Sequence, residues 1–164
     1  MPHLVIRQFP DPVLRRISEP VHGLKKPVRR FIERLIETMV AQPGGIGIAA
    51  PQVGVLKRVA IVDVSSRVPG AKQLILINPV ILKAEELRVS REGCMSLPHY
   101  TANVNRANQI YIRWKDLDLR THEMWAAGIE AICIQHEIDH LNGLLFLDRV
   151  GSLRTDVFRR KRYL

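Results

Sequence analysis

Residues 133–143, CIQHEIDHLNG, contain two histidines four positions apart. On an α-helix, positions i and i+4 lie on one face, so His136 and His140 could bind the same metal ion. Glu137 is displaced by about 100° around the helix from His136, which places its carboxylate close to an open coordination position. The segment therefore predicts a metal site with two ligands on one helix, and a third ligand must come from elsewhere.

In HExxH metalloproteases the third ligand follows the helix as a Glu or a His. After His140 this sequence contains no Glu, His or Cys, and its acidic residues there are Asp148 and Asp156 alone. The third ligand is therefore expected upstream of the helix. A peptidase in which Asp148 completes the site stays open as an alternative.

The two cysteines are the remaining candidates. Cys133 lies on the face of His136 and His140, but it is about 7.5 Å from the level of the metal along the helix axis. Its short side chain also leans toward the helix N-terminus, away from the metal. Cys94 follows Gly93, a residue that lets the backbone turn sharply. Cys94 is therefore the better third ligand, and core packing is its alternative role.

Residues 44–54, GGIGIAAPQVG, form a segment of small residues. No Lys-Ser or Lys-Thr pair follows, so a phosphate-binding loop is poorly supported. Small residues let another backbone approach closely, as an extended peptide would. Gln52 could donate its amide N–H to an oxyanion that forms on such a peptide.

The elements that must hold these residues follow from periodicity and turn residues. Apolar residues at helical spacing predict a helix over 27–42, and a second helix is expected over 128–142. Between them, β-branched or alternating runs predict strands over 57–65, 72–80, 81–93, 108–116 and 119–127. Strands without intervening helices indicate the α+β class, with mixed or antiparallel sheets packed around a central metal-binding helix. In that helix Ile129, Ile132 and Leu141 are expected to pack against the sheets.

Length and composition fit one domain spanning 1–164. The chain is 46% hydrophobic and 25% charged, and it has two cysteines, too few for a disulfide framework. A reducing cytoplasm is the simpler setting, and we see neither an export signal nor a membrane span. The formal net charge is +9, and residues 151–164 form a short basic tail. Such a tail attracts polyanions or is simply a solvated end.

Three motifs in order resemble those of the peptide deformylases, metallohydrolases that remove the N-terminal formyl group from nascent polypeptides. They are GIGIAAPQ (45–52), EGCMS (92–96) and QHEIDH (135–140), and FPDPVLRRISEPV (9–21) is similar to the family's N-terminal segment. The similarity runs from about residue 4 to Asp148. Met95 stands where the family usually has leucine. The short sequence after Asp148 suggests that the C-terminal helix of many bacterial members is reduced to a basic stub.

The resemblance implies a metal site and a general acid/base. Cys94, His136 and His140 would bind one divalent metal ion per chain, in agreement with the choice of Cys94 above. Glu137 would be the general acid/base. The resemblance implies Fe²⁺ in cells, and Zn²⁺, Ni²⁺ or Co²⁺ can occupy a site of this kind in purified protein.

The resemblance also implies a substrate site for formyl-methionyl nascent peptides. Gln52 and the backbone N–H of Met95 would hold the formyl oxygen. Asp139 would support the ligands from behind, with Arg106 as its charge partner. The residues that would contact the substrate peptide or its methionine side chain are Ile46, Gly47, Gly93, Ile129, Ile132 and Cys133.

Two alternatives to this function can be distinguished by experiment. An HExxH peptidase would need Asp148 as a ligand. A non-enzymatic RNA-binding protein would use the net charge and the basic tail, with a structural metal. The tail could also carry a deformylase to the ribosome, where formylated chains emerge. The sequence does not give the oligomeric state.

Overall fold

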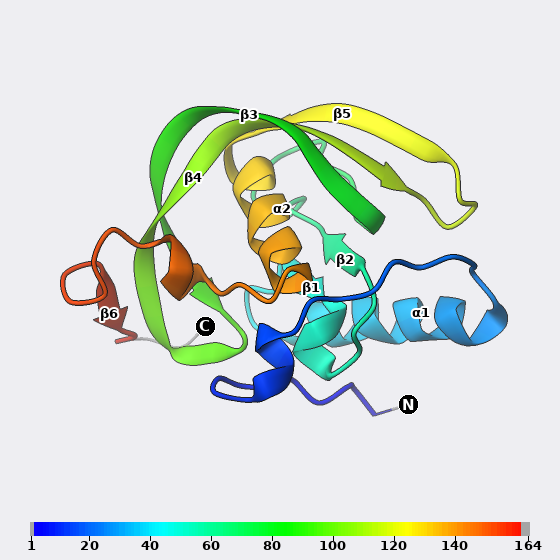
Figure 1. Cartoon of the computed structure of the whole chain (residues 1–164), viewed down its shortest axis with the longest axis horizontal. Coiled ribbons are helices and arrows are strands. Elements are labelled where there is room, and N and C mark those ends of the chain that lie inside the picture. The colour runs from blue at the N-terminus through cyan, green and yellow to red at the C-terminus, as the bar shows by residue number, and fades with distance from the viewer. Residues whose placement is uncertain (1, 162–164) are drawn as a thin grey trace.

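The computed structural model describes residues 2–161. These residues form an antiparallel sheet, two α-helices and three short 3-10 helices (Figure 1). The helices are α1 Lys26–Ala41, α2 Gly128–Leu141, η1 Pro12–Arg15, η2 Ala50–Val53 and η3 Phe146–Arg149. The strands are β1 Gly47–Ala49, β2 Val59–Val62, β3 Leu74–Cys94, β4 Leu97–Lys115, β5 Thr121–Ala127 and β6 Val157–Arg159. The predicted α+β class is confirmed, and every pairing between these strands is antiparallel.

The sheet has the order β1-β2-β3-β4-β5, and β6 pairs with the beginning of β4. Strands β3 and β4 form a long hairpin whose two-residue turn is Met95–Ser96. The register of this hairpin shifts in three places, the last between Gly93 and Cys94. Such irregularities bend strands and increase their twist. The hairpin consequently arches over α2 in Figure 1.

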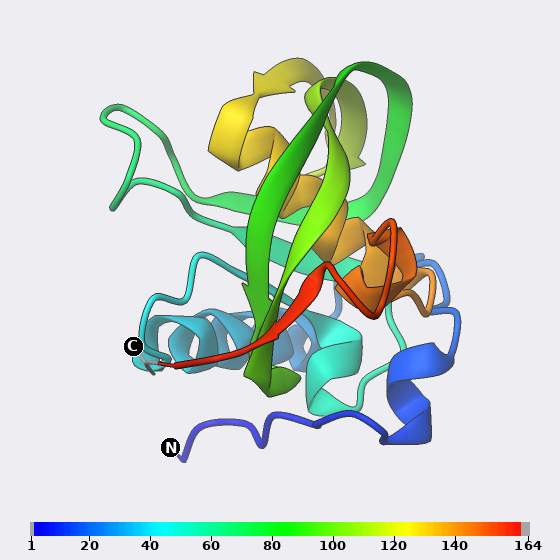
Figure 2. The same ribbon diagram turned by 90° about the vertical axis from the view of Figure 1, so that its left-hand side faces the viewer.

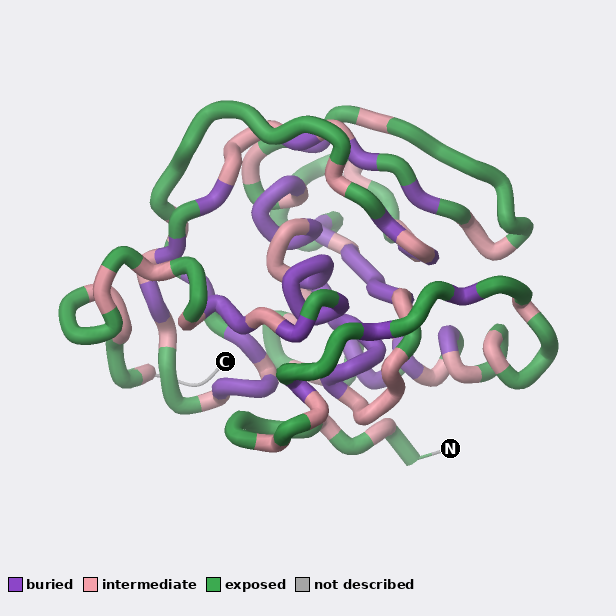
Figure 3. The backbone as a smooth tube through the Cα atoms, viewed as in Figure 1, coloured by how far each residue is buried: buried purple, intermediate pink, exposed green. Residues whose placement is uncertain are grey.

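Helix α2 lies in the centre of the molecule, and the purple tube in Figure 3 shows that most of it is buried. Ile134, Ile138 and Leu141 belong to a core cluster with residues of β2 and β4. Ile132 is buried as expected, but Ile129 is 37% exposed. The expected packing of Ile129 against the sheet is therefore wrong, because the first turn of α2 opens onto a cavity that Ile129 lines.

Helix α1 is amphipathic and packs against a second core cluster. Ile32, Leu35 and Met39 are its buried apolar residues, and they meet Ile48 and Ile61 of β1 and β2. A helix with one apolar stripe is held by this burial rather than by its own propensity. The predicted range 27–42 differs from the observed one by one residue at each end.

The strand predictions were correct in type and incomplete in extent. The runs 72–80 and 81–93 merge into the single strand β3, and β4 begins at Leu97 rather than at residue 108. The first part of β4 was missed because the third buried position of TANVNRAN is the charged Arg106 and because asparagine is uncommon in strands.

The C-terminal segment also differs from the expectation. Instead of a basic stub, residues 157–159 form β6, which pairs with Tyr100–Ala102 of β4. Figure 2 shows this red segment beside the hairpin of β3 and β4. Residues 162–164, the end of the predicted basic tail, lie outside the described residues. Within 2–161, no helix is long and apolar enough to cross a membrane.

Candidate metal centre

One thiol and two imidazoles converge beside α2. The ligand atoms of Cys94, His136 and His140 all lie within 4.8 Å of one another. Cys94 Sγ is 3.4 Å from His140 Nε2, and both residues are buried. The end of β3 supplies the cysteine, and one face of α2 supplies both histidines. A thiolate with two imidazoles suits Fe²⁺, Zn²⁺, Ni²⁺ or Co²⁺, and three protein ligands leave a coordination position open.

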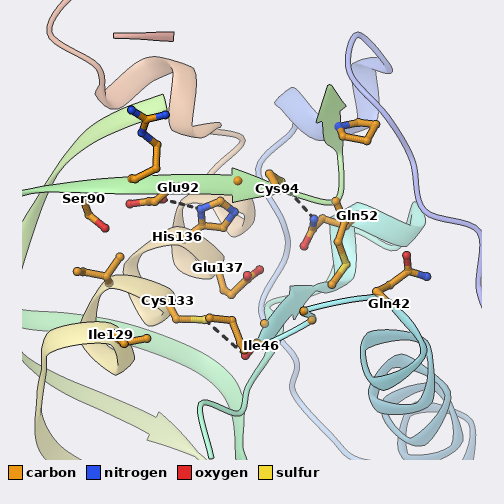
Figure 4. A pocket seen from close by; sticks show the side chains of 18 of the residues that line it. Gln42, Ile46, Gln52, Ser90, Glu92, Cys94, Ile129, Cys133, His136 and Glu137 are labelled. Atoms are coloured by element: carbon orange, nitrogen blue, oxygen red, sulfur yellow. Dashed lines mark hydrogen bonds and ion pairs between the residues drawn. The ribbon is translucent and has the colours of Figure 1, made fainter. Parts of the chain in front are cut away.

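Glu92 orients the first histidine, a contact that the sequence analysis did not assign. Its Oε1 lies 2.8 Å from His136 Nδ1, which leaves Nε2 to face the metal site (Figure 4). Arg106 donates to both Glu92 oxygens, at 2.8 and 2.9 Å. Burial by itself would raise the pKa of Glu92, but the hydrogen bonds from Arg106 and His136 outweigh it and hold that pKa at about 2. A carboxylate behind a metal-binding histidine fixes the ring and increases its basicity.

Asp139 and Arg106 meet as the resemblance implied. Arg106 Nη1 donates to Asp139 Oδ2 at 2.6 Å, and both side chains are buried. Arg149 of η3 donates to the same carboxylate, with Nη2 at 2.9 Å from Oδ1. Arg106 thus bridges two carboxylates. One is Glu92, which orients His136, and the other is Asp139, on the helix that carries both histidines. In the sequence, the only indication of a role for Glu92 was its position in the EGCMS motif, and nothing indicated a role for Arg149.

Glu137 lies buried beside the three ligands. Its Oε2 has no hydrogen-bond partner among the described residues, and burial raises the pKa of Glu137 to about 7. Such a carboxyl can both accept and donate a proton near neutral pH. Helix α2 can approach β1 this closely because residue 47 is glycine. A Cβ at Gly47 would lie 2.6 Å from Glu137 Oε1 and 2.7 Å from Cys133 Sγ.

Gln52 is held with its amide nitrogen toward the site. The backbone N–H of Ala49 donates to Gln52 Oε1 at 2.9 Å, which fixes the orientation of the amide. Gln52 Nε2 then points to Ser96 Oγ at 3.2 Å and to Cys94 Sγ at 3.6 Å. Met95 follows Cys94 in the hairpin turn. The side-chain amide of Gln52 therefore places an N–H donor directly beside the candidate metal ligand Cys94.

A cavity of about 460 Å³ opens in front of these groups, and Figure 4 shows part of its lining. It is lined by all six residues predicted to contact a substrate, namely Ile46, Gly47, Gly93, Ile129, Ile132 and Cys133. Cys133 donates from Sγ to the Ile46 carbonyl at 3.5 Å, and burial raises the pKa of its thiol well above the usual value. A neutral thiol in this position is a wall of the cavity, and Cys133 lies outside the ligand group.

A family model for polypeptide deformylases matches residues 3–156. The chain belongs to this family. Among curated deformylases, that of Thermodesulfovibrio yellowstonii is 40% identical over 158 residues, which are 96% of this chain and 95% of the relative. The deformylase of Azotobacter vinelandii is 43% identical over 159 residues, 96% of this chain and 93% of its own. The predicted class of enzyme, a peptide deformylase, is confirmed by these relatives.

Solved deformylase structures have the same fold. That from Thermotoga maritima superimposes with a TM-score of 0.85 at 37% identity, covering 93% of this chain and all of that one. A Synechococcus elongatus deformylase in complex with actinonin has a TM-score of 0.85 at 38% identity, with coverages of 94% and 82%. An Acinetobacter baumannii deformylase with bound Met-Ala-Ser has a TM-score of 0.83 at 32% identity, with coverages of 91% and 99%.

Proposed function

We propose that this deformylase removes the formyl group from N-terminal formyl-methionine of nascent polypeptides, in the cytoplasm, with one divalent metal ion per chain. The observation that carries the proposal is the group of Cys94, His136 and His140 with the buried Glu137 beside it. The binding of Met-Ala-Ser by the Acinetobacter baumannii relative supports a peptide that begins with methionine. Fe²⁺ is the proposed ion in cells, with Zn²⁺, Ni²⁺ or Co²⁺ as substitutes.

The donor set fits such an ion. The side chains of Cys94, His136 and His140 lie within reach of one centre, and Glu92 holds the His136 ring so that Nε2 is available. An ion held there would supply Lewis acidity and activate a water molecule as the nucleophile, since such ions lower the pKa of water to about 7.

The residues around the ion divide the remaining work. Glu137 takes a proton from the water and delivers it to the leaving amine, and its raised pKa matches this exchange. Gln52 Nε2, fixed by the Ala49 hydrogen bond, donates to the formyl oxygen as negative charge develops on it. The backbone N–H of Met95 is the second donor, so its side chain is free to differ from leucine.

The cavity binds the peptide. The side chains of Ile46, Ile129 and Ile132, with Cys133, form an apolar wall for the methionine side chain. Gly47 of β1 and Gly93 of β3 both line the cavity, and their backbone groups pair with the peptide as an added strand.

The test is purification without oxygen, measurement of the metal content, and assay of formyl-Met-Ala-Ser beside acetyl-Met-Ala-Ser and free Met-Ala-Ser. We expect one ion per chain and hydrolysis of the formylated peptide alone. Equal hydrolysis of the acetylated peptide, or cleavage of the Met-Ala bond, would contradict the proposal.

The peptidase alternative would require Asp148 at the metal. Asp148 instead forms an ion pair with Arg15 and accepts a hydrogen bond from the Leu145 backbone N–H at 2.8 Å. Cys94→Ala should therefore abolish metal binding and Asp148→Ala should preserve it. The opposite result in measured metal content would favour the peptidase.

We further propose that the basic tail contacts the ribosome. Arg154, Arg159 and Lys161 are exposed, whereas removal of the whole segment would also remove β6. Replacing these three residues by Gln should weaken co-sedimentation with ribosomes and leave peptide hydrolysis intact. Unchanged co-sedimentation would eliminate the tail as the contact.

A further inference from the structure

The mouth of the cavity is strongly basic, a property that the proposed chemistry does not use. Four arginines line the cavity, and no ion pair joins any of them to an acidic side chain within residues 2–161. They are Arg67, Arg88, Arg91 and Arg160. The two acidic residues of the lining, Glu92 and Glu137, are buried, and Glu92 is already paired with Arg106. Among the described residues, the positive charge of the mouth therefore has no ion-pair partner.

The C-terminal strand delivers one of these arginines to the substrate site. Thr101 of β4 pairs with Gly93 on one side and with Phe158 of β6 on the other. Arg91 stacks its guanidinium over the Phe158 ring, 4.0 Å from the centroid. Arg160, two residues beyond Phe158, reaches the same side, and its Nη2 fills the space that a Cβ on Gly93 would occupy. Glycine at 93 thus makes room for a guanidinium from a distant segment.

Arg160 is anchored at its backbone, and one donor of its side chain has no partner among the described residues. Its backbone N–H donates to the His99 carbonyl at 2.8 Å, which continues the contact of β6 with β4. Its Nε is buried and has no hydrogen-bond partner in the described part of the chain. Arg160 lines the same cavity as Cys94, but neighbouring residues of a strand face opposite sides, so the guanidinium at Gly93 lies on the face of β3 away from the Cys94 thiol.

The alternation of side chains along a bound, extended peptide decides which of them meets these arginines. Successive side chains of an extended chain point to opposite faces. If the methionine side chain enters the apolar cavity, the side chain of the second residue points to the mouth. Carboxylates are the groups that guanidinium donors bind with matched geometry and charge.

We propose that Arg160, supported by Arg91, Arg88 and Arg67, forms a subsite for a carboxylate on the second residue of the substrate. This inference rests on the proposed function and adds a preference to it. The enzyme then hydrolyses peptides with Glu or Asp after formyl-methionine faster than peptides with a neutral or basic residue there.

The experiment compares formyl-Met-Glu-Ser, its neutral isostere formyl-Met-Gln-Ser and formyl-Met-Lys-Ser with the metal-loaded enzyme. Because Arg67, Arg88 and Arg91 are exposed and Arg160 is half-buried, we expect a KM for the Glu peptide that is roughly fivefold lower than for the Gln peptide, at similar kcat. The Lys peptide should have the highest KM. The preference should shrink at high salt, since exposed charges are screened.

Three variants identify the residue responsible. Arg160→Gln should bring the ratio of KM values for the Gln and Glu peptides to about one, and Arg160→Lys should restore most of the preference. Arg159→Gln is the matched control, since it removes the same charge one residue away. Arg159 lies with Val157 on the other side of β6, where Val157 packs on a core cluster. For Arg159→Gln, the ratio of KM values for the Gln and Glu peptides should equal that of the wild type.

The outcomes separate the two proposals. Hydrolysis of the Gln peptide without a preference for Glu, or equal loss in Arg159→Gln and Arg160→Gln, overturns the subsite and leaves the deformylase function standing. Absence of hydrolysis of every formylated peptide overturns the proposed function and the subsite with it. Inhibition by a short RNA that requires Arg160, with no Glu preference, would assign the arginines to nucleic acid and refute the peptide subsite.

Discussion

Arg106 is the residue whose loss should damage this protein most without removing a proposed metal ligand. Its side chain is 3% exposed and lies between the side chains of Glu92 and Asp139, which are 6% and 8% exposed. Three hydrogen bonds of 2.6 to 2.9 Å join the guanidinium to the two carboxylates. Replacing Arg106 by Met would leave two buried carboxylates without this partner.

The expected cost follows from that burial. Removing one partner of a buried ion pair typically costs about 3–5 kcal/mol, because a charge is left uncompensated. Arg149 provides the matched control, since it binds the same Asp139 carboxylate but its side chain is 46% exposed. Exposed ion pairs contribute about 0–1 kcal/mol, so Arg149→Met should cost no more than about 1 kcal/mol.

Equilibrium urea unfolding, followed by far-UV circular dichroism, measures both costs. With a slope of about 2 kcal/mol per molar urea, Arg106→Met should lower the midpoint by roughly 2 M and Arg149→Met by less than about 0.5 M. The triple change Glu92→Gln, Arg106→Met and Asp139→Asn should be less destabilised than Arg106→Met alone, because no charge is left buried. Equal midpoints for Arg106→Met and Arg149→Met would refute this reasoning.

Three further predictions concern the catalytic groups. Glu137→Gln should retain the metal, measured by elemental analysis, and lose nearly all hydrolysis of formyl-Met-Ala-Ser; full activity would exclude Glu137 as the acid/base. Gln52→Ala should also retain the metal and lower kcat by about 10²–10³, the usual effect of removing one oxyanion donor. Gly47→Ala should lower activity and destabilise the fold by about 1–3 kcal/mol, since its methyl group would overlap Glu137 and Cys133. An Ala variant with normal activity and urea midpoint would contradict the close approach.

Local rules were enough to place the two histidines. The α-helical repeat puts His136 and His140 on one face wherever the helix packs, and the absence of a Glu, His or Cys ligand after His140 directed the search to Cys94. The structure brings these three residues together. The class of fold was accessible for the same reason, since the strand and helix periodicities are local properties.

The support of the site depended on the register of the long hairpin, which local patterns do not fix. Glu92 pairs with Ala102 across β3 and β4, and this register puts the Glu92 and Arg106 side chains on the same face, where the long Arg106 side chain reaches Glu92. A shift by one residue would turn one of these side chains to the other face of the sheet. The sequence analysis therefore gave Arg106 a partner on α2 and missed the one on β3.

The C-terminal segment is the clearest case in which tertiary structure decided the outcome. Its composition indicated only a basic tail, because a three-residue strand has too little periodicity to be recognised. The free edge of β4 at Tyr100–Ala102 supplies the partner that makes Val157–Arg159 a strand. That pairing carries Arg160 across the hairpin to Gly93. By itself the sequence predicted the three candidate metal ligands and the chemistry they would allow, whereas long-range strand pairing determined which charges surround them.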